Sequence, residues 1–160
     1  MNKQMSLTVG SDQRWRTPVA LYRELHEIFK FNFDPCPADP VVSGLDIHWK
    51  ESNFVNPPYD NIGEWLWKGY VESMPPGGKS SVFLIPAWTD RSYFHDIAFR
   101  FGTVVFLEGR IQFNRKDGKT RCLFPSCLVI FDGGKIYEEA IGKAFGDVSA
   151  MRCGKHLPRG

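Results

Sequence analysis

The feature that most restricts the fold is a short apolar run between Ser80 and Pro86, which has the length of a β-strand. A strand that is apolar on both sides belongs in a sheet that is covered on both faces. Segments with helical periodicity alternate with strand-like segments along the chain. We therefore predict an α/β sheet with helices on both faces and with functional loops at the carboxyl ends of its strands. The predicted helices span residues 18–30, 62–74, 91–101 and 137–144, and the other predicted strands span residues 31–34, 53–56, 103–107 and 126–131.

The chain is long enough for one folded domain with a real core and too short for two. It has 160 residues, of which 42% are hydrophobic and 14% aromatic, so its composition excludes disordered and fibrous proteins. We expect a flexible N-terminal arm over residues 1–12 and a single compact domain over residues 13–160. The sequence has no apolar stretch of about 18 residues and no signal-peptide pattern, so we expect a cytoplasmic protein without a membrane partner. The four cysteines lack the paired spacing of a zinc site, so we expect reduced thiols and no metal.

The net charge of +2 is unevenly distributed along the chain. The segment from Arg110 to Arg121 holds five basic residues and one acidic residue, which gives it a net charge of +4. The remaining 148 residues therefore carry −2. One concentrated basic segment on a nearly neutral chain predicts a local contact with a polyanion, although a solvated hairpin tip would have the same composition.

Asn56, Pro57, Pro58 and Tyr59 form a turn directly after a short apolar strand, where an α/β fold presents active-site groups. The two prolines lack N–H groups, so the turn offers carbonyl oxygens without competing donors. An amino group on a conjugated ring has two hydrogens to donate and a delocalised lone pair. The Asn56 side-chain oxygen and the Pro57 carbonyl could accept both hydrogens, which would localise that lone pair on the nitrogen. Because the Tyr59 ring could stack on the base that bears the nitrogen, we predict that all four residues are catalytic.

Five segments in a fixed order carry a resemblance to a known family. They are Trp15–Pro18, Phe33–Cys36, Phe54–Tyr59, Leu84–Ala87 and Glu108–Phe113. The turn resembles the Asp/Asn/Ser-Pro-Pro-Tyr/Phe signature of the S-adenosylmethionine-dependent amino methyltransferases. The order of the segments resembles the phage-type DNA N6-adenine methyltransferases over roughly residues 13–133. The resemblance implies a compact class I (Rossmann-like) fold of three α/β/α layers, methyl transfer to adenine N6 in DNA and, for a phage protein, a location in the host cytoplasm.

The resemblance also implies which residues hold S-adenosylmethionine. Thr17 and Pro18, which are also a good N-cap and first residue for a helix, would contact its methionine end. The residues from Asp34 onward would lie beside it. The predicted cofactor-binding residues are Trp15, Thr17, Pro18, Asp34, Pro35 and Cys36.

The segment after Asp34 departs from the family pattern. Many relatives have a glycine-rich turn there, whereas Pro35, Cys36 and Pro37 follow Asp34 in this chain. Bulkier residues do not allow the same close approach of the backbone to a ligand. Only 22 residues separate Asp34 from Asn56, too few for the usual β-α-β elements. Either the cofactor half is trimmed, or Asp34 and Asp46 divide roles that two strand ends normally share.

A DNA substrate requires residues that stack on a flipped base and residues that hold phosphates. Flipping a base out of a duplex costs a few kcal/mol, and stacking on aromatic rings returns about 1–3 kcal/mol per base. A chain this short has few residues left to read bases. We therefore expect a short or relaxed target sequence, or a homodimer whose two subunits share recognition of the target. The predicted nucleic-acid-binding residues are Trp65, Trp88 and Phe113 as stacking surfaces and Arg110, Arg115, Lys116, Lys119 and Arg121 as phosphate contacts.

Other functions share the same turn. Transfer to cytosine N4, to adenine in RNA or to a protein glutamine also presents a planar NH₂ group, although the basic segment favours nucleic acid. A DNA-binding module that kept the fold and lost the cofactor is a further alternative, because the glycine-rich turn is missing.

Overall fold

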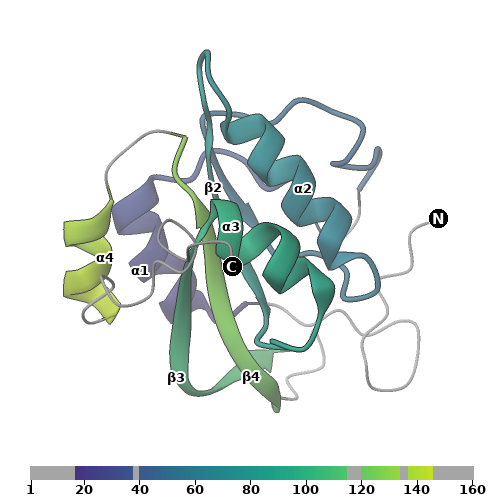
Figure 1. The fold of residues 1–160 in the computed structure, drawn as a ribbon. Helices are drawn as coiled ribbons and strands as arrows, with labels where there is room; N and C mark the ends of the chain where they lie inside the picture. The colour runs from purple at the N-terminus through teal and green to yellow at the C-terminus, as the bar shows by residue number, and fades with distance from the viewer. Residues whose placement is uncertain (1–16, 38–39, 115–119, 134–136, 146–160) are drawn as a thin grey trace, which may run out of the picture.

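The computed structural model describes residues 17–37, 40–114, 120–133 and 137–145, and Figure 1 shows their arrangement. They form a mixed α/β fold around one four-stranded sheet. The predicted arm over residues 1–12 lies outside the described residues. The helices are α1 (Val19–Phe29), α2 (Ile62–Ser73), α3 (Phe99–Phe101) and α4 (Glu138–Phe145), with a π-helical turn η1 (Phe94–Ala98) before α3. The strands are β1 (Ser52–Val55), β2 (Ser80–Pro86), β3 (Thr103–Asn114) and β4 (Thr120–Phe131).

The sheet has the strand order β1-β2-β4-β3. β1 and β2 pair in parallel because α2 connects them, and a helical crossover lets the chain re-enter the sheet in the same direction. β4 pairs antiparallel with both β2 and β3. The predicted α/β class is confirmed, and the sheet is mixed. β3 and β4 are longer than the predicted strands because they continue as a hairpin past the end of β2.

The predicted strand over residues 31–34 is wrong as a full strand. Phe33 forms a single parallel bridge with Asn53, and the Phe54 N–H donates to the Phe33 carbonyl at 3.1 Å. Pro35 follows two residues later without an N–H group, so the ladder cannot continue. The segment nevertheless runs beside β1 in the same direction, which brings Asp34 toward the end of β1.

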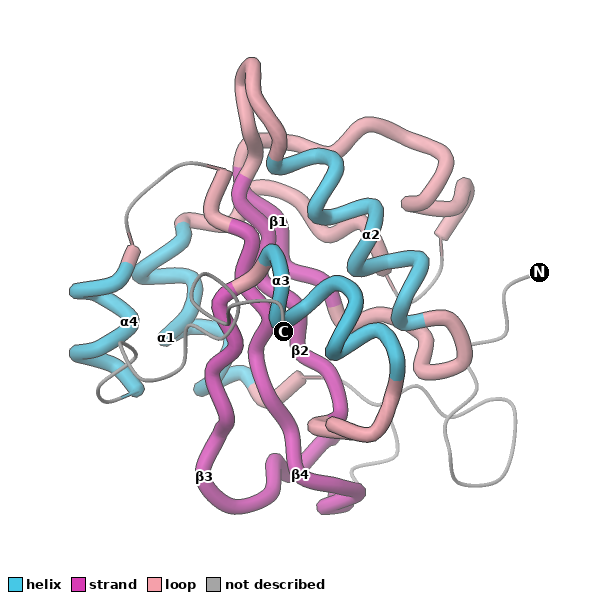
Figure 2. The backbone as a smooth tube through the Cα atoms, in the orientation of Figure 1, coloured by secondary structure: helices cyan, strands magenta, loops and turns pink. Residues whose placement is uncertain are grey.

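Both faces of the sheet are covered. All seven residues of β2 are buried, and their side chains alternate between two core clusters. Val82 and Leu84 join the cluster that contains buried residues of α1 and α4, whereas Phe83 and Ile85 join the cluster that contains those of α2 and η1. Figure 2 shows α1 and α4 on one side of the strands and α2 on the other. The two-sided burial expected for this apolar run is confirmed.

α2 packs one face against the sheet. Its buried residues are Ile62, Trp65, Leu66 and Gly69. A Cβ atom on Gly69 would lie 2.5 Å from the Phe83 ring, so the missing side chain lets the helix approach β2 closely. Trp67, two residues from Trp65, is 51% exposed because residues two apart on a helix do not share a face.

Two predicted helix boundaries need correction. Pro18 rather than Thr17 is the N-cap of α1, since the Pro18 carbonyl accepts the first intrahelical hydrogen bond, from the Tyr22 N–H at 3.1 Å. The predicted helix over residues 91–101 is not one continuous α-helix, because the Phe99 N–H bonds the Phe94 carbonyl across a π turn. No helix among the described residues is long and apolar enough to cross a membrane.

A nearly buried carboxylate ties the end of α2 to the start of β2. The Glu72 side chain is 6% exposed and pairs with Lys68 at 2.8 Å and with Lys79. Burial by itself would raise the pKa of Glu72, but the hydrogen bonds and charges of Lys68 and Lys79 outweigh it and lower the pKa to about 2. The exposed His48 ring lies 3.6 Å from the same carboxylate.

We predict that Glu72→Gln destabilises the protein in a pH-dependent way. A carboxylate whose pKa falls from 4.5 to about 2 on folding stabilises the fold above pH 4.5. This contribution is lost as the pH falls toward 2. Urea unfolding at pH 7 should therefore show a loss of roughly 1–3 kcal/mol in the free energy of unfolding. The difference should shrink steadily below pH 4.5.

The matched control is Glu139→Gln, whose ion pair with Lys143 is exposed on both sides. Exposed pairs contribute less than about 1 kcal/mol, so this variant should unfold nearly like the wild type. Equal effects of the two substitutions would contradict the role assigned to Glu72.

Candidate active site

The predicted catalytic turn lies at the carboxyl edge of the sheet. β1 and β2 are parallel, so the residues that follow each strand emerge at the same edge. Asn56 to Tyr59 follow β1, and Ala87 and Trp88 follow β2. The N–H of Ala87 donates to the Pro125 carbonyl at 2.9 Å, which joins β4 to this edge.

The start of α1 reaches the same edge. The Ser52 hydroxyl donates to the Phe29 carbonyl at 2.6 Å, so α1 ends beside the beginning of β1. From there its 11 residues run back over about 16 Å, slightly more than the length of β1. The Tyr22 ring meets the Phe54 ring edge-on at 5.2 Å, which places the first turn of α1 level with the end of β1. Thr17 and Pro18 therefore lie near the predicted catalytic turn.

Within the turn, the side chains divide into buried and accessible ones. Pro57 and Pro58 are buried, whereas Asn56 and Tyr59 are partly exposed. Among the described residues, the Asn56 side chain has no hydrogen-bond partner, so its amide oxygen is available as an acceptor. The prolines lock the turn, and the polar group and the ring remain accessible.

Three aromatic rings meet at this edge. The Tyr59 ring contacts Trp88 at 6.2 Å and Phe124 at 5.1 Å between centroids, and Trp88 and Phe124 lie 5.7 Å apart. Burial raises the pKa of the Tyr59 hydroxyl, so the ring stays neutral well into the alkaline range. Tyr59 and Trp88 pack against both core clusters, which places them where the sheet ends.

Phe124 was missed by the sequence prediction. The predicted strand over residues 126–131 begins two residues after Phe124, and the predicted basic segment ends at Arg121, so neither includes this ring. In the structure β4 begins at Thr120, and Pro125 pairs with Arg110 next to a register shift. The alternation of Phe124, Ser126 and Leu128 along the strand was the signal that could have found it.

Two predicted stacking surfaces are wrong. Trp65 is 3% exposed and belongs to the core beneath α2, and Phe113 is 1% exposed and belongs to the opposite cluster. Neither ring can stack on a base from these positions. Trp65 is drawn inward because residues 62, 65, 66 and 69 form the face of α2 that covers the sheet.

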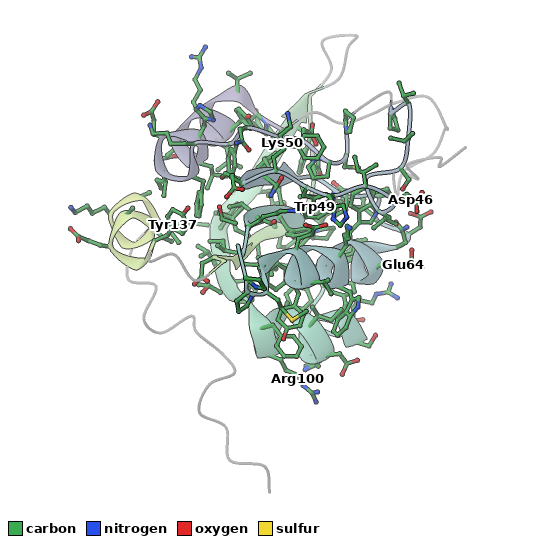
Figure 3. The ribbon with its side chains drawn as sticks, turned by 90° about the horizontal axis from the view of Figure 1, so that it is seen from above. Asp46, Trp49, Lys50, Glu64, Arg100 and Tyr137 are labelled. Carbon is green, nitrogen blue, oxygen red and sulfur yellow. The ribbon has the colours of Figure 1, made fainter. Side chains whose placement is uncertain are left out.

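The connection between Asp34 and β1 has no helix or strand among its described residues, 35–37 and 40–51. This favours the first alternative, a cofactor-binding half of the fold that has lost the usual β-α-β elements. Asp46 is exposed at the outer rim of this connection, whereas Trp49 points inward toward α2 (Figure 3). Nothing in this placement brings Asp46 to the end of β1, which speaks against shared roles of Asp34 and Asp46.

A glycine that the sequence prediction overlooked shapes the loop after Asp34. A Cβ atom on Gly44 would lie 2.0 Å from the Pro35 carbonyl oxygen and 3.0 Å from Cη2 of Trp65. The Trp49 indole N–H donates to the Gly44 carbonyl at 2.8 Å and holds this contact in place. Close backbone packing is thus achieved by a glycine later in the chain rather than by a glycine-rich turn.

Asp34 closes a tight turn at the start of this loop. Its carboxylate accepts a hydrogen bond from the Cys36 N–H at 2.9 Å. Partial desolvation raises the pKa of Asp34, and this hydrogen bond opposes the rise. This turn comes directly after the bridge between Phe33 and Asn53.

Two buried polar atoms at the start of α2 have no partner among the described residues. They are Nε1 of Trp65, whose ring reaches Gly44, and Oδ1 of Asn61, the N-cap residue of α2. Buried donors and acceptors are nearly always satisfied in native proteins. These two atoms, one helical turn apart at the start of α2, are exceptions to that pattern.

The basic segment belongs to the hairpin of β3 and β4. Arg110 is exposed and pairs in the ladder with Pro125, and Arg121 pairs with Phe113. β2 ends at Pro86 opposite Ser126, so β4 extends about 20 Å beyond β2 on its way from Thr120. We call residues 110–114 and 120–125 the hairpin extension. Arg115, Lys116 and Lys119 lie outside the described residues, between the last ladder pair, Asn114 and Thr120.

The turn at the edge of this mixed α/β sheet is fixed by two prolines and presents an amide oxygen and a neutral aromatic ring. This arrangement suits an enzyme that acts on the amino group of a planar base. The model of the family described as DNA N-6-adenine-methyltransferase (Dam) matches residues 5–134. The chain belongs to this family, and it is an enzyme that methylates adenine N6 in DNA. No curated protein and no solved structure gives a significant match to the chain.

Proposed function

We propose that the enzyme takes its methyl group from S-adenosylmethionine on a trimmed class I, Rossmann-like scaffold of three α/β/α layers. The support is the parallel alignment of the Asp34 segment, β1 and β2, with helices on both faces of the sheet. When bound, S-adenosylmethionine supplies a methyl group activated by its sulfonium. The residues that would hold it are Trp15, Thr17, Pro18, Asp34, Pro35 and Cys36, of which Trp15 lies outside the described residues.

The observation that carries the proposal is that the Asn56 amide, which has no hydrogen-bond partner among the described residues, shares a turn at the carboxyl edge with the partly exposed Tyr59. An adenine amino group placed here would donate one hydrogen to Asn56 and the other to the Pro57 carbonyl. The nitrogen lone pair would then be held out of conjugation with the ring, in position to react. Tyr59 would stack on the base, and Trp88, whose ring lies 6.2 Å from that of Tyr59, would lie beside it. A strong general base is not required, because alignment of the reactants supplies most of the acceleration.

Analysis of nucleosides tests the transfer. Duplex DNA is incubated with S-adenosylmethionine that carries a labelled methyl group and is then digested to nucleosides. The label should appear in N6-methyl-2′-deoxyadenosine. Label in N4-methylcytosine, or in RNA in preference to DNA, would contradict the assignment.

Calorimetry with S-adenosylhomocysteine tests cofactor binding separately. Binding in the micromolar range is expected. No heat of binding at millimolar concentration would favour a DNA-binding module without a cofactor over the proposed enzyme.

We further propose that the basic residues on and beside the hairpin extension hold DNA phosphates. We predict that replacing Arg115, Lys116 and Lys119 together with Ala flattens the salt dependence of DNA binding. Each phosphate contact contributes about 0.9 to the log–log slope, so three lost contacts should reduce it by about 2.7. The test is to measure DNA affinity by fluorescence anisotropy at salt concentrations from about 50 to about 200 mM.

Lys143→Ala is the control for the removal of positive charge away from the hairpin extension, because Lys143 is an exposed cation on α4. An unchanged slope in the triple variant would make the segment a solvated hairpin tip. A homodimer that shares recognition and a cytoplasmic location remain predictions, and sedimentation of the protein with and without DNA tests the first.

A further inference from the structure

We propose that Phe124 is a positioning residue that sets the orientation of the Tyr59 ring and links it to the hairpin extension. The inference rests on the proposed function, because it assumes that Tyr59 stacks on the target adenine. It deepens that proposal by connecting DNA-backbone contact with base stacking.

Phe124 is the ring that joins three others. It is 7% exposed and lies 5.1 Å from Tyr59, 5.7 Å from Trp88 and 6.0 Å from Phe113 between centroids. Tyr59 and Trp88 belong to the loops after β1 and β2, whereas Phe113 and Phe124 belong to the hairpin. A change in the position of Phe124 would therefore alter its ring contacts with both loops.

The contact angles suit a positioning role. The Tyr59 ring stands at 84° to Phe124 and at 73° to Trp88, so neither neighbour is stacked parallel on it. Edge-to-face contacts are directional, so two of them restrict the rotation of the Tyr59 side chain. A base could then be accepted against a ring whose orientation is already set.

The backbone allows the hairpin extension to act on this cluster. At its root, the Ala87 N–H bonds the Pro125 carbonyl, one residue after Phe124. Beyond that point β4 pairs with β3 and has left β2. The β3–β4 register shifts on both sides of Arg110, and Gly109 has a positive φ of 73°. The hairpin therefore bends at the level of Phe124, and phosphates held farther out on it would move this ring.

The test compares Phe124→Leu, which removes the ring, with Phe124→Tyr, which keeps it. The rate is measured on a duplex carrying a site mapped by sequencing DNA that the wild-type enzyme has methylated. A second duplex of the same sequence, with 2-aminopurine in place of the target adenine, reports base flipping by fluorescence. For Phe124→Leu we expect kcat to fall by about tenfold or more and the 2-aminopurine signal to decrease, since one directional ring contact contributes about this much. DNA affinity and S-adenosylhomocysteine affinity should stay within about twofold, and Phe124→Tyr should restore most of kcat.

Phe131→Leu is the control for a core defect, because Phe131 is 1% exposed and lies at the opposite end of β4. It should lower the melting temperature without lowering kcat at a temperature where the protein is folded. Wild-type kcat and fluorescence in Phe124→Leu would overturn the inference, as would equal losses of kcat in Phe124→Leu and Phe131→Leu. A wild-type enzyme that methylates no adenine would instead refute the proposed function, so the two failures are distinguishable.

Discussion

Replacing Asn56 with Ala should reduce methyl transfer to DNA by about 10²–10³-fold, because one directional hydrogen-bond acceptor aimed at the reacting group is lost. In the structure the Asn56 side chain has no other partner among the described residues, so its loss should not disturb the fold. Thermal unfolding and S-adenosylhomocysteine binding should therefore remain near wild type. The rate is measured in single turnover, with label counted in N6-methyl-2′-deoxyadenosine from digested DNA.

Asn56→Asp provides the matched control. Aspartate keeps an acceptor oxygen at the same position, and the signature of amino methyltransferases admits Asp there, so activity should be largely retained. A rate in Asn56→Ala close to that of the wild type would remove Asn56 from the mechanism. A loss that tracks a fall in melting temperature would give the turn a structural role instead.

Replacing Gly44 with Ala should weaken cofactor-product binding by about tenfold or more and destabilise the fold by roughly 1–3 kcal/mol, the usual cost of overpacking. The new Cβ atom would lie 2.0 Å from the Pro35 carbonyl oxygen and 2.8 Å from its carbonyl carbon. These are backbone atoms, which cannot rotate away as a side chain can. Pro35 and Cys36, which are predicted to hold the cofactor, would be displaced. Calorimetry with S-adenosylhomocysteine and urea unfolding measure the two effects.

Gly63→Ala separates this effect from glycine substitution in general. A Cβ atom on Gly63 would make an ordinary contact of 3.5 Å with Cβ of Tyr93. Alanine is a better helix former than glycine by up to about 1 kcal/mol, so this variant should be as stable as the wild type or more stable. If Gly44→Ala bound S-adenosylhomocysteine with unchanged affinity, the loop after Asp34 would not be part of the cofactor site.

The elements were largely predictable, because their signals are local. The two-sided burial of β2, the periodicity of α1 and α2 and the break at Pro57 each depend on residues close together in the chain. The two-residue spacing of Trp65 and Trp67 also showed that only one of the two could be buried with the core. Which one was not decided by spacing, and the prediction that Trp65 stacks on DNA was wrong because the buried face of α2 includes it.

The site was predictable in its motif and not in its surroundings. The position of Asn56 to Tyr59 after a strand follows from the local order of residues. The meeting of Tyr59, Trp88 and Phe124, in contrast, requires that β4 run antiparallel beside β2. Strand pairing between distant segments depends on closing long loops and on the fit of whole faces, so no short window of sequence carries it. The contact of Gly44 with Pro35 is of the same kind.

Residues close together in the sequence were thus sufficient to predict the α/β class, the turn fixed by prolines and the basic segment. Secondary-structure propensity and short motifs depend on near neighbours in the chain. Tertiary packing alone decided that Phe113 is core, that Phe124 reaches Tyr59 and that a later glycine shapes the loop after Asp34. The reason is physical: burial and ring contacts are properties of surfaces that come together only when the sheet has formed.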